Sequence, residues 1–211
     1  MDYKAAIFDL DGTLIDSNSV WAKIDKIILR KRGIVCSDEF IHKIAAMTYE
    51  EAAEEMRKIG VKDSVEEIIS ECNELAIKEY RYNIFLKDGA KEYLDYLKNN
   101  GIKIALATAS PKLLYEPVLR NNCIYNYFHA FCTTDSVGKS KDYPDIYLFA
   151  ASKLQVSPSE CIVFEDVLKG IISAKNAGMT VIGVFDKYSN EDIITIRNTS
   201  DKFIMNFFEM L

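Results

Sequence analysis

Short, nearly continuous runs of apolar residues recur along the sequence, and amphipathic segments separate them. Such runs are typical of strands that are buried on both faces of a parallel sheet. Because the runs alternate with helical patterns from about residue 88 onward, the sequence predicts a doubly wound α/β fold with a mostly parallel sheet. The runs cover 4–10, 102–108, 161–165, 180–185 and, more briefly, 202–205, and the helical patterns cover 90–101, 111–122 and 144–155.

The region from residue 17 to 86 breaks this alternation. It shows no convincing strand, and its apolar residues recur at helical spacing. Ser64 with Glu67, and Thr48 with Glu51, have the spacing of capping boxes. Because the joints on either side are short, the region suits a hinged lid better than a tethered module. The sequence predicts an α/β core at 1–16 and 87–211 and a helical cap at 17–86, with helices over 19–33, 37–47, 48–60 and 64–82.

Composition narrows the class of protein further. The chain has 211 residues, of which 49% are hydrophobic and 27% charged, as in an ordinary globular protein. Its formal net charge of −6 disfavours a general affinity for nucleic acid or an anionic membrane, because both need a basic surface. The five cysteines form no C-x-x-C pair, and no run approaches the ~20 apolar residues of a membrane span. We therefore expect a cytoplasmic monomer or weak dimer without nucleic-acid or membrane partners.

Acidic side chains occur where two of the predicted strands end. Asp9 and Asp11 lie at the end of the first run, and Glu165 and Asp166 follow CIVF at the end of the third. Because an open parallel sheet binds ligands at the carboxyl ends of its strands, we expect these four carboxylates on one rim. Clustered carboxylates repel one another, so they must take up protons or bind a cation. Oxygen ligands of this kind suit Mg²⁺, which binds a few carboxylates together with waters and phosphate oxygens.

Four motifs then occur in the order of a known family. FDLDGT at 8–13, LATAS at 106–110, the lysine of KDYPD at 141–145, and FED at 164–166 with Gly170 resemble the four motifs of the haloacid dehalogenase superfamily of aspartate-dependent phosphotransferases. The resemblance covers the whole chain and implies a Rossmann-like core. The helical insert after the first motif is similar to the cap of the branch that contains phosphoglycolate phosphatases and β-phosphoglucomutases.

The resemblance implies a role for each acidic residue. Asp9 is the expected nucleophile, which attacks phosphorus and forms an aspartyl phosphate. Asp11 is the expected general acid and base, which protonates the leaving oxygen and then accepts a proton from water. Mg²⁺ is expected to bind the Asp9 side chain, the Asp11 backbone carbonyl and Asp166, with Glu165 close by or acting through a water molecule.

Phosphoryl transfer also needs donors aimed at the phosphate oxygens. We expect these donors to be Thr108, the Ala109 amide and Lys141. The segment GKSKDYPD offers Lys139 as well, but the family spacing, with the lysine three residues before the proline, selects Lys141. A proline usually follows that lysine, whereas Asp142 follows it here and places a carboxylate beside the phosphate-binding cation.

Trp21 and Tyr49 are the candidate substrate-binding residues of the cap. Mutases of the β-phosphoglucomutase type usually carry a histidine where Trp21 stands, and an arginine that binds a second phosphate where Tyr49 stands. An aromatic pair does not bind a dianion as a guanidinium does. Hydrolysis of the phosphate ester is therefore favoured over a mutase reaction. Packing within the cap is the alternative interpretation of both residues. His42 and His129 have no second ligand nearby in the sequence and are interpreted as structural.

The sequence thus predicts a Mg²⁺-dependent phosphatase that hydrolyses a small phosphorylated metabolite, of the sugar phosphate or phosphoglycolate type. The first alternative is a phosphohexomutase similar to β-phosphoglucomutase. The second, from another class, is a phosphate-accepting switch similar to a response-regulator receiver domain, which would keep its phosphoryl group for long periods and would lack a cap. Dehalogenation of haloalkanoic acids is less favoured, because Asp11 and the metal ligands would have no role in it.

Overall fold

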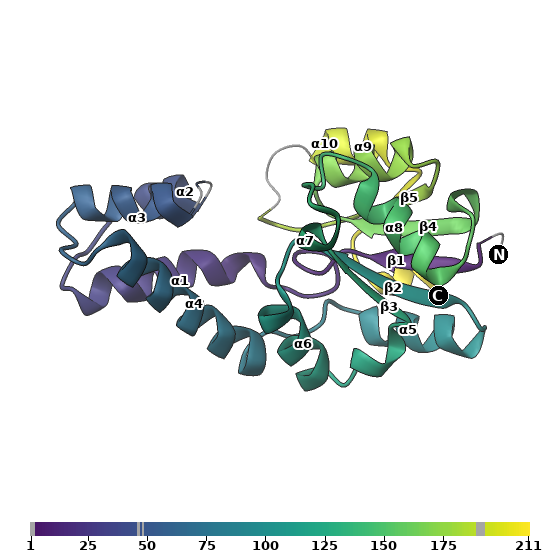
Figure 1. Ribbon diagram of the computed structural model, residues 1–211, viewed down its shortest axis with the longest axis horizontal. Helices are drawn as coiled ribbons and strands as arrows, with labels where there is room; N and C mark the ends of the chain where they lie inside the picture. Colours follow the sequence, from purple (N-terminus) through teal and green to yellow (C-terminus); the bar gives the residue numbers. More distant parts are fainter. Residues whose placement is uncertain (1–2, 46, 48, 189–192) are drawn as a thin grey trace. The chain divides into compact units, whose positions relative to one another are not determined.

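The computed structural model describes residues 3–45, 47, 49–188 and 193–211 of the chain (Figure 1). The chain forms two compact units. We call them the α/β unit, which comprises Met1–Asp16 and Ile84–Leu211, and the helical unit, which comprises Ser17–Asn83.

The second joint between these units lies a few residues before the position placed from the sequence, which was after Leu86. The reason is a backbone pairing between the segment after the helical unit and the loop after the first strand. The Asp16 amide donates a hydrogen bond to the Phe85 carbonyl at 3.1 Å, and the Lys87 amide donates to the Leu14 carbonyl at 2.9 Å. These bonds tie Phe85 and Leu86 to the α/β unit.

A six-stranded sheet, within the described residues, forms the centre of the α/β unit. Its strand order is β3-β2-β1-β4-β5-β6, and each neighbouring pair is parallel. In the central strand β1, Ile7 lies in register with Ala105 of β2 and Val163 of β4. The strands are β1 (Ala5–Phe8), β2 (Lys103–Thr108), β3 (Ala130–Thr133), β4 (Cys161–Glu165), β5 (Thr180–Val184) and β6 (Lys202–Ile204).

Helices cover both faces of this sheet (Figure 1). α8 contacts β1, β2 and β3, and α9 contacts β4 and β5, whereas α5 packs on β2 from the opposite face. All four residues of β1 are fully buried between these layers, which explains why its sequence is continuously apolar. The helices of this unit are α5 (Ala90–Asn99), α6 (Lys112–Asn121), α7 (Thr134–Val137), α8 (Asp145–Leu154), α9 (Leu168–Asn176) and α10 (Ile193–Thr199), with short 3₁₀ turns at Tyr125–Tyr127, Pro158–Glu160 and Phe207–Met210.

Aromatic rings fill the core on the α5 side of the sheet. The Phe8 and Phe164 rings, from neighbouring strands, stack with their centroids 4.6 Å apart. Tyr93 of α5 meets Phe164 edge-on at 5.4 Å, and Phe207 packs against the same group. On the α8 and α9 side the core is built mainly from small and aliphatic side chains. Side chains therefore pack against both faces of β1 and β4. This packing holds the ends of the two strands in place, together with the residues that follow them.

The helical unit consists of α1 (Asn18–Lys31), α2 (Asp38–Ala45), α3 (Tyr49–Lys58) and α4 (Val65–Tyr82). α1 packs on α2 and α4, and α3 packs on α2 and α4. The capping box at the start of α4 is confirmed, because the Ser64 hydroxyl accepts a hydrogen bond from the Glu67 amide and the Glu67 carboxylate accepts one from the Ser64 amide. The other predicted capping box includes Thr48, which lies outside the described residues.

The predicted doubly wound α/β fold is confirmed, with one strand missed. The five apolar runs form β1, β2, β4, β5 and β6, but β3 was not recognised. β3 is a short strand at the edge of the sheet, and its residues alternate between buried and half-buried positions, so it lacks the continuous apolar character of its neighbours. None of the described helices is both long and apolar enough to cross a bilayer.

Candidate active site

The candidate site lies where β1, β2 and β4 end at the same edge of the sheet. Asp9 directly follows β1, Thr108 is the last residue of β2, and Glu165 is the last residue of β4. After β1 the chain turns at Gly12, whose φ of 79° lies in the left-handed region that glycine adopts at no steric cost. This turn brings the Thr13 hydroxyl to Asp166, to which it donates a hydrogen bond at 2.9 Å.

Three carboxylates gather at this edge. Asp9, Glu165 and Asp166 each place an oxygen within 4.8 Å of the other two, and all three residues are buried. Burial raises the pKa of Asp9 well above its ordinary value, and the negative charges of Glu165, Asp166 and Asp11 raise it further, while Lys141 opposes the rise. The site therefore has an excess of buried negative charge that a cation would relieve.

Lys141 lies between two of these carboxylates. Its ammonium group forms ion pairs with Asp9 and, at 2.6 Å, with Glu165, although the lysine is far from both in the sequence. Burial by itself would lower the pKa of Lys141, but the charges of Asp9 and Glu165 together outweigh burial and raise it. Lys141 therefore stays positively charged at the edge where Asp9 lies.

Glu165 is held from several sides, so it fixes the position of Lys141. One carboxylate oxygen accepts hydrogen bonds from Lys141 and from the Tyr147 hydroxyl at 2.8 Å. The other accepts from the amides of Asp166, at 3.0 Å, and Val167, at 3.3 Å. A β-carbon at Gly170 would lie 2.4 Å from the Glu165 carboxylate, so glycine is needed there for this close approach.

The ends of β1 and β2 are linked through Ser110. The Ser110 hydroxyl donates a hydrogen bond to the Asp11 carboxylate at 2.6 Å, and the Ser110 amide donates to the Thr108 hydroxyl at 2.9 Å. Asp11 is half-buried, Thr108 is fully buried, and Ala109 between Thr108 and Ser110 is exposed. The structure thus places Asp11, Thr108 and Ala109 on the edge that carries Asp9 and Lys141.

The structure separates the two lysines that the sequence offered. Lys139 is exposed and pairs with Asp145 at 2.7 Å, whereas Lys141 reaches Asp9. Asp142, expected to place a carboxylate beside the phosphate-binding cation, instead accepts a hydrogen bond from Ser140 and pairs with Lys169 at 3.3 Å. Its pKa is lowered by these two partners, so its charge is satisfied away from the site.

The buried carboxylates are suitable ligands for Mg²⁺. Mg²⁺ prefers hard oxygen ligands and usually keeps several water molecules and phosphate oxygens in its coordination shell. A few carboxylates at one edge of the sheet match this preference. Asp9 and Asp166 are the side chains that would hold it. Both oxygens of Glu165 already accept hydrogen bonds, so Glu165 supports the site through Lys141 as well as through its charge.

The remaining predicted residues are Trp21, Tyr49 and the two histidines. Trp21 of α1 and Tyr49 of α3 belong to the helical unit, where their ring centroids are 5.6 Å apart. The His129 ring nitrogen Nδ1 accepts a hydrogen bond from the Ile104 amide at 3.0 Å, which supports its structural interpretation. The side chain of His42 lies outside the described part of the structure.

Tyr147 is a site residue that sequence reasoning missed. Its hydroxyl hydrogen-bonds Glu165, its ring lies 5.9 Å from the Lys141 ammonium, and burial raises its pKa well above the ordinary value, so it remains a donor. A signal was available, because Tyr147 lies on the buried face of α8 with Ile146 and Ala150. A buried tyrosine hydroxyl requires a polar partner.

Known proteins resemble this chain in sequence and in fold. The family profile described as haloacid dehalogenase-like hydrolase matches residues 6–184. A validoxylamine A 7'-phosphate phosphatase of Streptomyces hygroscopicus subsp. limoneus is 31% identical over 193 residues, covering 90% of this chain and 89% of the relative. A β-phosphoglucomutase of Bacillus subtilis is 32% identical over 209 residues, covering 94% and 91%. The crystal structure of a putative β-phosphoglucomutase from Thermotoga maritima has a TM-score of 0.87 at 26% identity, covering 95% and 94%.

A parallel, doubly wound sheet with buried carboxylates at the ends of its central strands defines an α/β enzyme with its site at the sheet edge. The family match covers most of the chain, and the chain belongs to the haloacid dehalogenase-like hydrolases. Within that family, several relatives are named as phosphatases, which supports a hydrolytic phosphatase.

Proposed function

We propose that this phosphatase hydrolyses a small phosphorylated metabolite, of the sugar phosphate or phosphoglycolate type, with Mg²⁺ as its cofactor. The observation that carries the proposal is the ion pair of the half-buried Lys141 with the buried Asp9, next to the buried Asp166, at the carboxyl edge of the sheet. The names of one phosphatase relative and one mutase relative each refer to a phosphorylated compound. These names support a small phosphorylated metabolite as the substrate.

In this proposal, Asp9 attacks the phosphorus atom and forms an aspartyl phosphate, and the alcohol leaves. A buried carboxylate with few water molecules around it is a stronger nucleophile than an exposed one, provided that it is ionised. Lys141 favours the ionised form of Asp9 and opposes the effect of burial on its pKa. The bound Mg²⁺ would supply further positive charge beside the phosphate oxygens, held by Asp9, Asp166 and the Asp11 backbone carbonyl.

Asp11 acts as general acid and base in the two half-reactions. It donates a proton to the leaving oxygen and later accepts one from the water that attacks the aspartyl phosphate, which restores its protonation state. The hydrogen bond from Ser110 orients the Asp11 carboxyl group for this work. Thr108, the Ala109 amide and Lys141 stabilise the negative charge on the transferring phosphoryl group.

We further propose that the helical unit is the cap of this enzyme. Closure of a cap excludes bulk water and completes the binding of the substrate. Trp21 and Tyr49 of this unit contact each other and carry no positive charge, so they offer no guanidinium for a second phosphate. The absence of a guanidinium at these two positions favours hydrolysis of the aspartyl phosphate by water over transfer of its phosphoryl group back to a sugar, as in a mutase. We also propose that the protein is a cytoplasmic monomer or weak dimer, and its net charge of −6 disfavours a general affinity for nucleic acid.

The test is phosphate release from a generic aryl phosphate in the presence of Mg²⁺. We expect Asp9→Asn to abolish turnover, because the amide keeps the shape of the side chain but is not a nucleophile. Asp142→Asn is the matched control, because its carboxylate is exposed and pairs with Lys169 outside the site. Undiminished turnover by folded Asp9→Asn would contradict the assignment. A stable phosphoenzyme in the unmodified protein would support the phosphate-accepting switch instead.

A further inference from the structure

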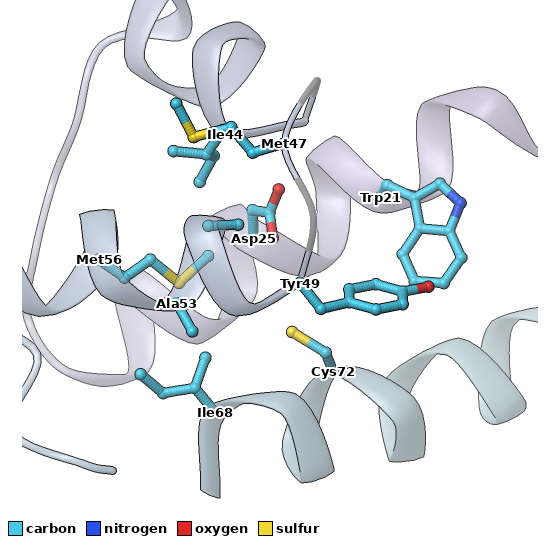
Figure 2. A pocket seen from close by; sticks show the side chains of 10 residues that line it. Trp21, Asp25, Ile44, Met47, Tyr49, Ala53, Met56, Ile68 and Cys72 are labelled. Atoms are coloured by element: carbon cyan, nitrogen blue, oxygen red, sulfur yellow. The ribbon is translucent and has the colours of Figure 1, made fainter. Parts of the chain in front are cut away.

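The helical unit contains a cavity of about 190 Å³ that is lined by residues of α1, α2, α3 and α4 (Figure 2). An apolar cavity of about 150 Å³ is large enough for one benzene-sized molecule. The cavity can therefore hold a small organic group. Most of its walls are apolar, and they include Ile44, Met47, Ala53, Met56 and Ile68.

Asp25 of α1 interrupts these apolar walls. Figure 2 shows its carboxyl group among the side chains that line the cavity, and the residue is only 8% exposed. Burial raises the pKa of Asp25 to about 7, and no charge or hydrogen bond of the described residues contributes to the shift. Burial disfavours the charged form of this carboxyl group, so a cationic ligand beside it would offset that cost.

Aromatic rings stand on one side of the cavity. Trp21 and Tyr49 lie together there, with ring centroids 5.6 Å apart and planes inclined by 58°, and Met56 and Ala53 lie on the opposite side (Figure 2). The faces of such rings attract cations through their negative π-electron density, and tryptophan does so most strongly. A carboxylate beside two aromatic rings therefore favours an organic cation.

We propose that this cavity binds the head group of a small organic cation, a quaternary ammonium or a protonated amine, with Asp25 as its counter-ion and Trp21 and Tyr49 as its aromatic walls. A bare metal ion does not fit, because it needs several oxygen ligands, and the lining supplies one carboxyl group and one protonated thiol among mostly apolar and aromatic side chains. An uncharged sugar does not fit either, because its hydroxyls need more polar partners than the lining provides.

The inference rests on the proposed function only for the origin of the cation, which is either an amino group carried by the phosphorylated substrate, as in an amino sugar phosphate, or a separate effector. Binding itself can be measured without catalysis, because Trp21 is the single tryptophan of the chain and lines the cavity. Its fluorescence reports occupancy directly. Failure of this test and failure of the phosphatase proposal are therefore distinguishable.

The experiment titrates the full-length protein with choline and, in parallel, with the uncharged analogue in which carbon replaces the quaternary nitrogen. We expect choline to change the Trp21 fluorescence saturably and to bind at least about tenfold more tightly than the analogue. Asp25→Asn should remove this preference. The control Asp38→Asn, which removes an exposed carboxylate of the same unit, should retain it. Calorimetry repeats the measurement without a spectroscopic probe.

The proposal is overturned if choline causes no saturable change, if the analogue binds as tightly, or if folded Asp25→Asn keeps the preference for the cation. Where choline binds, its effect on aryl phosphate hydrolysis identifies the source of the natural ligand. Competitive inhibition by choline indicates the substrate's own head group, whereas any other pattern indicates a separate ligand. The cation site stands in both cases.

Discussion

The buried carboxyl group of Asp25 leads to a quantitative prediction about stability. Its pKa rises from an ordinary 3.8 to about 7 because burial disfavours the charged form. Above pH 3.8 the unfolded chain loses this proton while the folded chain keeps it, so stability falls with rising pH until the folded group also ionises near pH 7. Each pKa unit is worth about 1.4 kcal/mol, so the full penalty is of the order of 4 kcal/mol, and it is complete only above pH 7.

Asp25→Asn removes the titrating proton and keeps the size of the side chain. We expect the variant to gain stability relative to the unmodified protein as the pH rises. About 3 kcal/mol of the gain should appear between about pH 5 and about pH 8. Cys72, which lines the same cavity, does not interfere, because burial, with smaller contributions from neighbouring acidic charges, raises the pKa of its thiol to about 12.

The assay is urea unfolding, followed by the fluorescence of Trp21 at both pH values. Trp21 lies on α1 with Asp25, so its signal reports on the helical unit. Asp38→Asn is the control, because it removes an exposed carboxylate from the same unit. If the stability difference between the unmodified protein and Asp25→Asn is the same at both pH values, the reasoning from burial is refuted.

Three further substitutions test the packing around the site and the helical unit. Gly170→Ala places a methyl group 2.4 Å from the Glu165 carboxylate, so we expect kcat to fall by roughly 10- to 100-fold, and an unchanged kcat would show that this close approach is not needed. Lys87→Met leaves the buried Asp186 carboxylate without its ion pair at 2.8 Å and should cost about 3 kcal/mol in urea unfolding; a cost below about 1 kcal/mol would contradict this. Ser64→Ala removes the cap of α4 and should lower the thermal stability of the helical unit by about 1 kcal/mol, with an unchanged melting transition as the contrary result.

The chemistry of the site could be read from the sequence because it depends on strand ends. Asp9 and Glu165 mark the ends of two apolar runs, and parallel strands bring their carboxyl ends to one edge whatever the details of packing. Lys141 could be selected only by family spacing. Its contact with Asp9 joins positions far apart in the chain, so it depends on how the loop before α8 is placed.

Local pattern determined most of the architecture. Continuous apolar runs gave the central strands, helical spacing gave the four helices between residues 17 and 83, and the Ser64 capping box gave the start of α4, because each of these signals is complete within a few neighbouring residues. Tertiary structure alone decided that Tyr147 supports Glu165 and that β3 joins the edge of the sheet. It alone also decided that the Asp25 carboxyl lies among the side chains of several helices. These features depend on which distant surfaces meet, and desolvation and hydrogen bonding act on a side chain only once those surfaces have met.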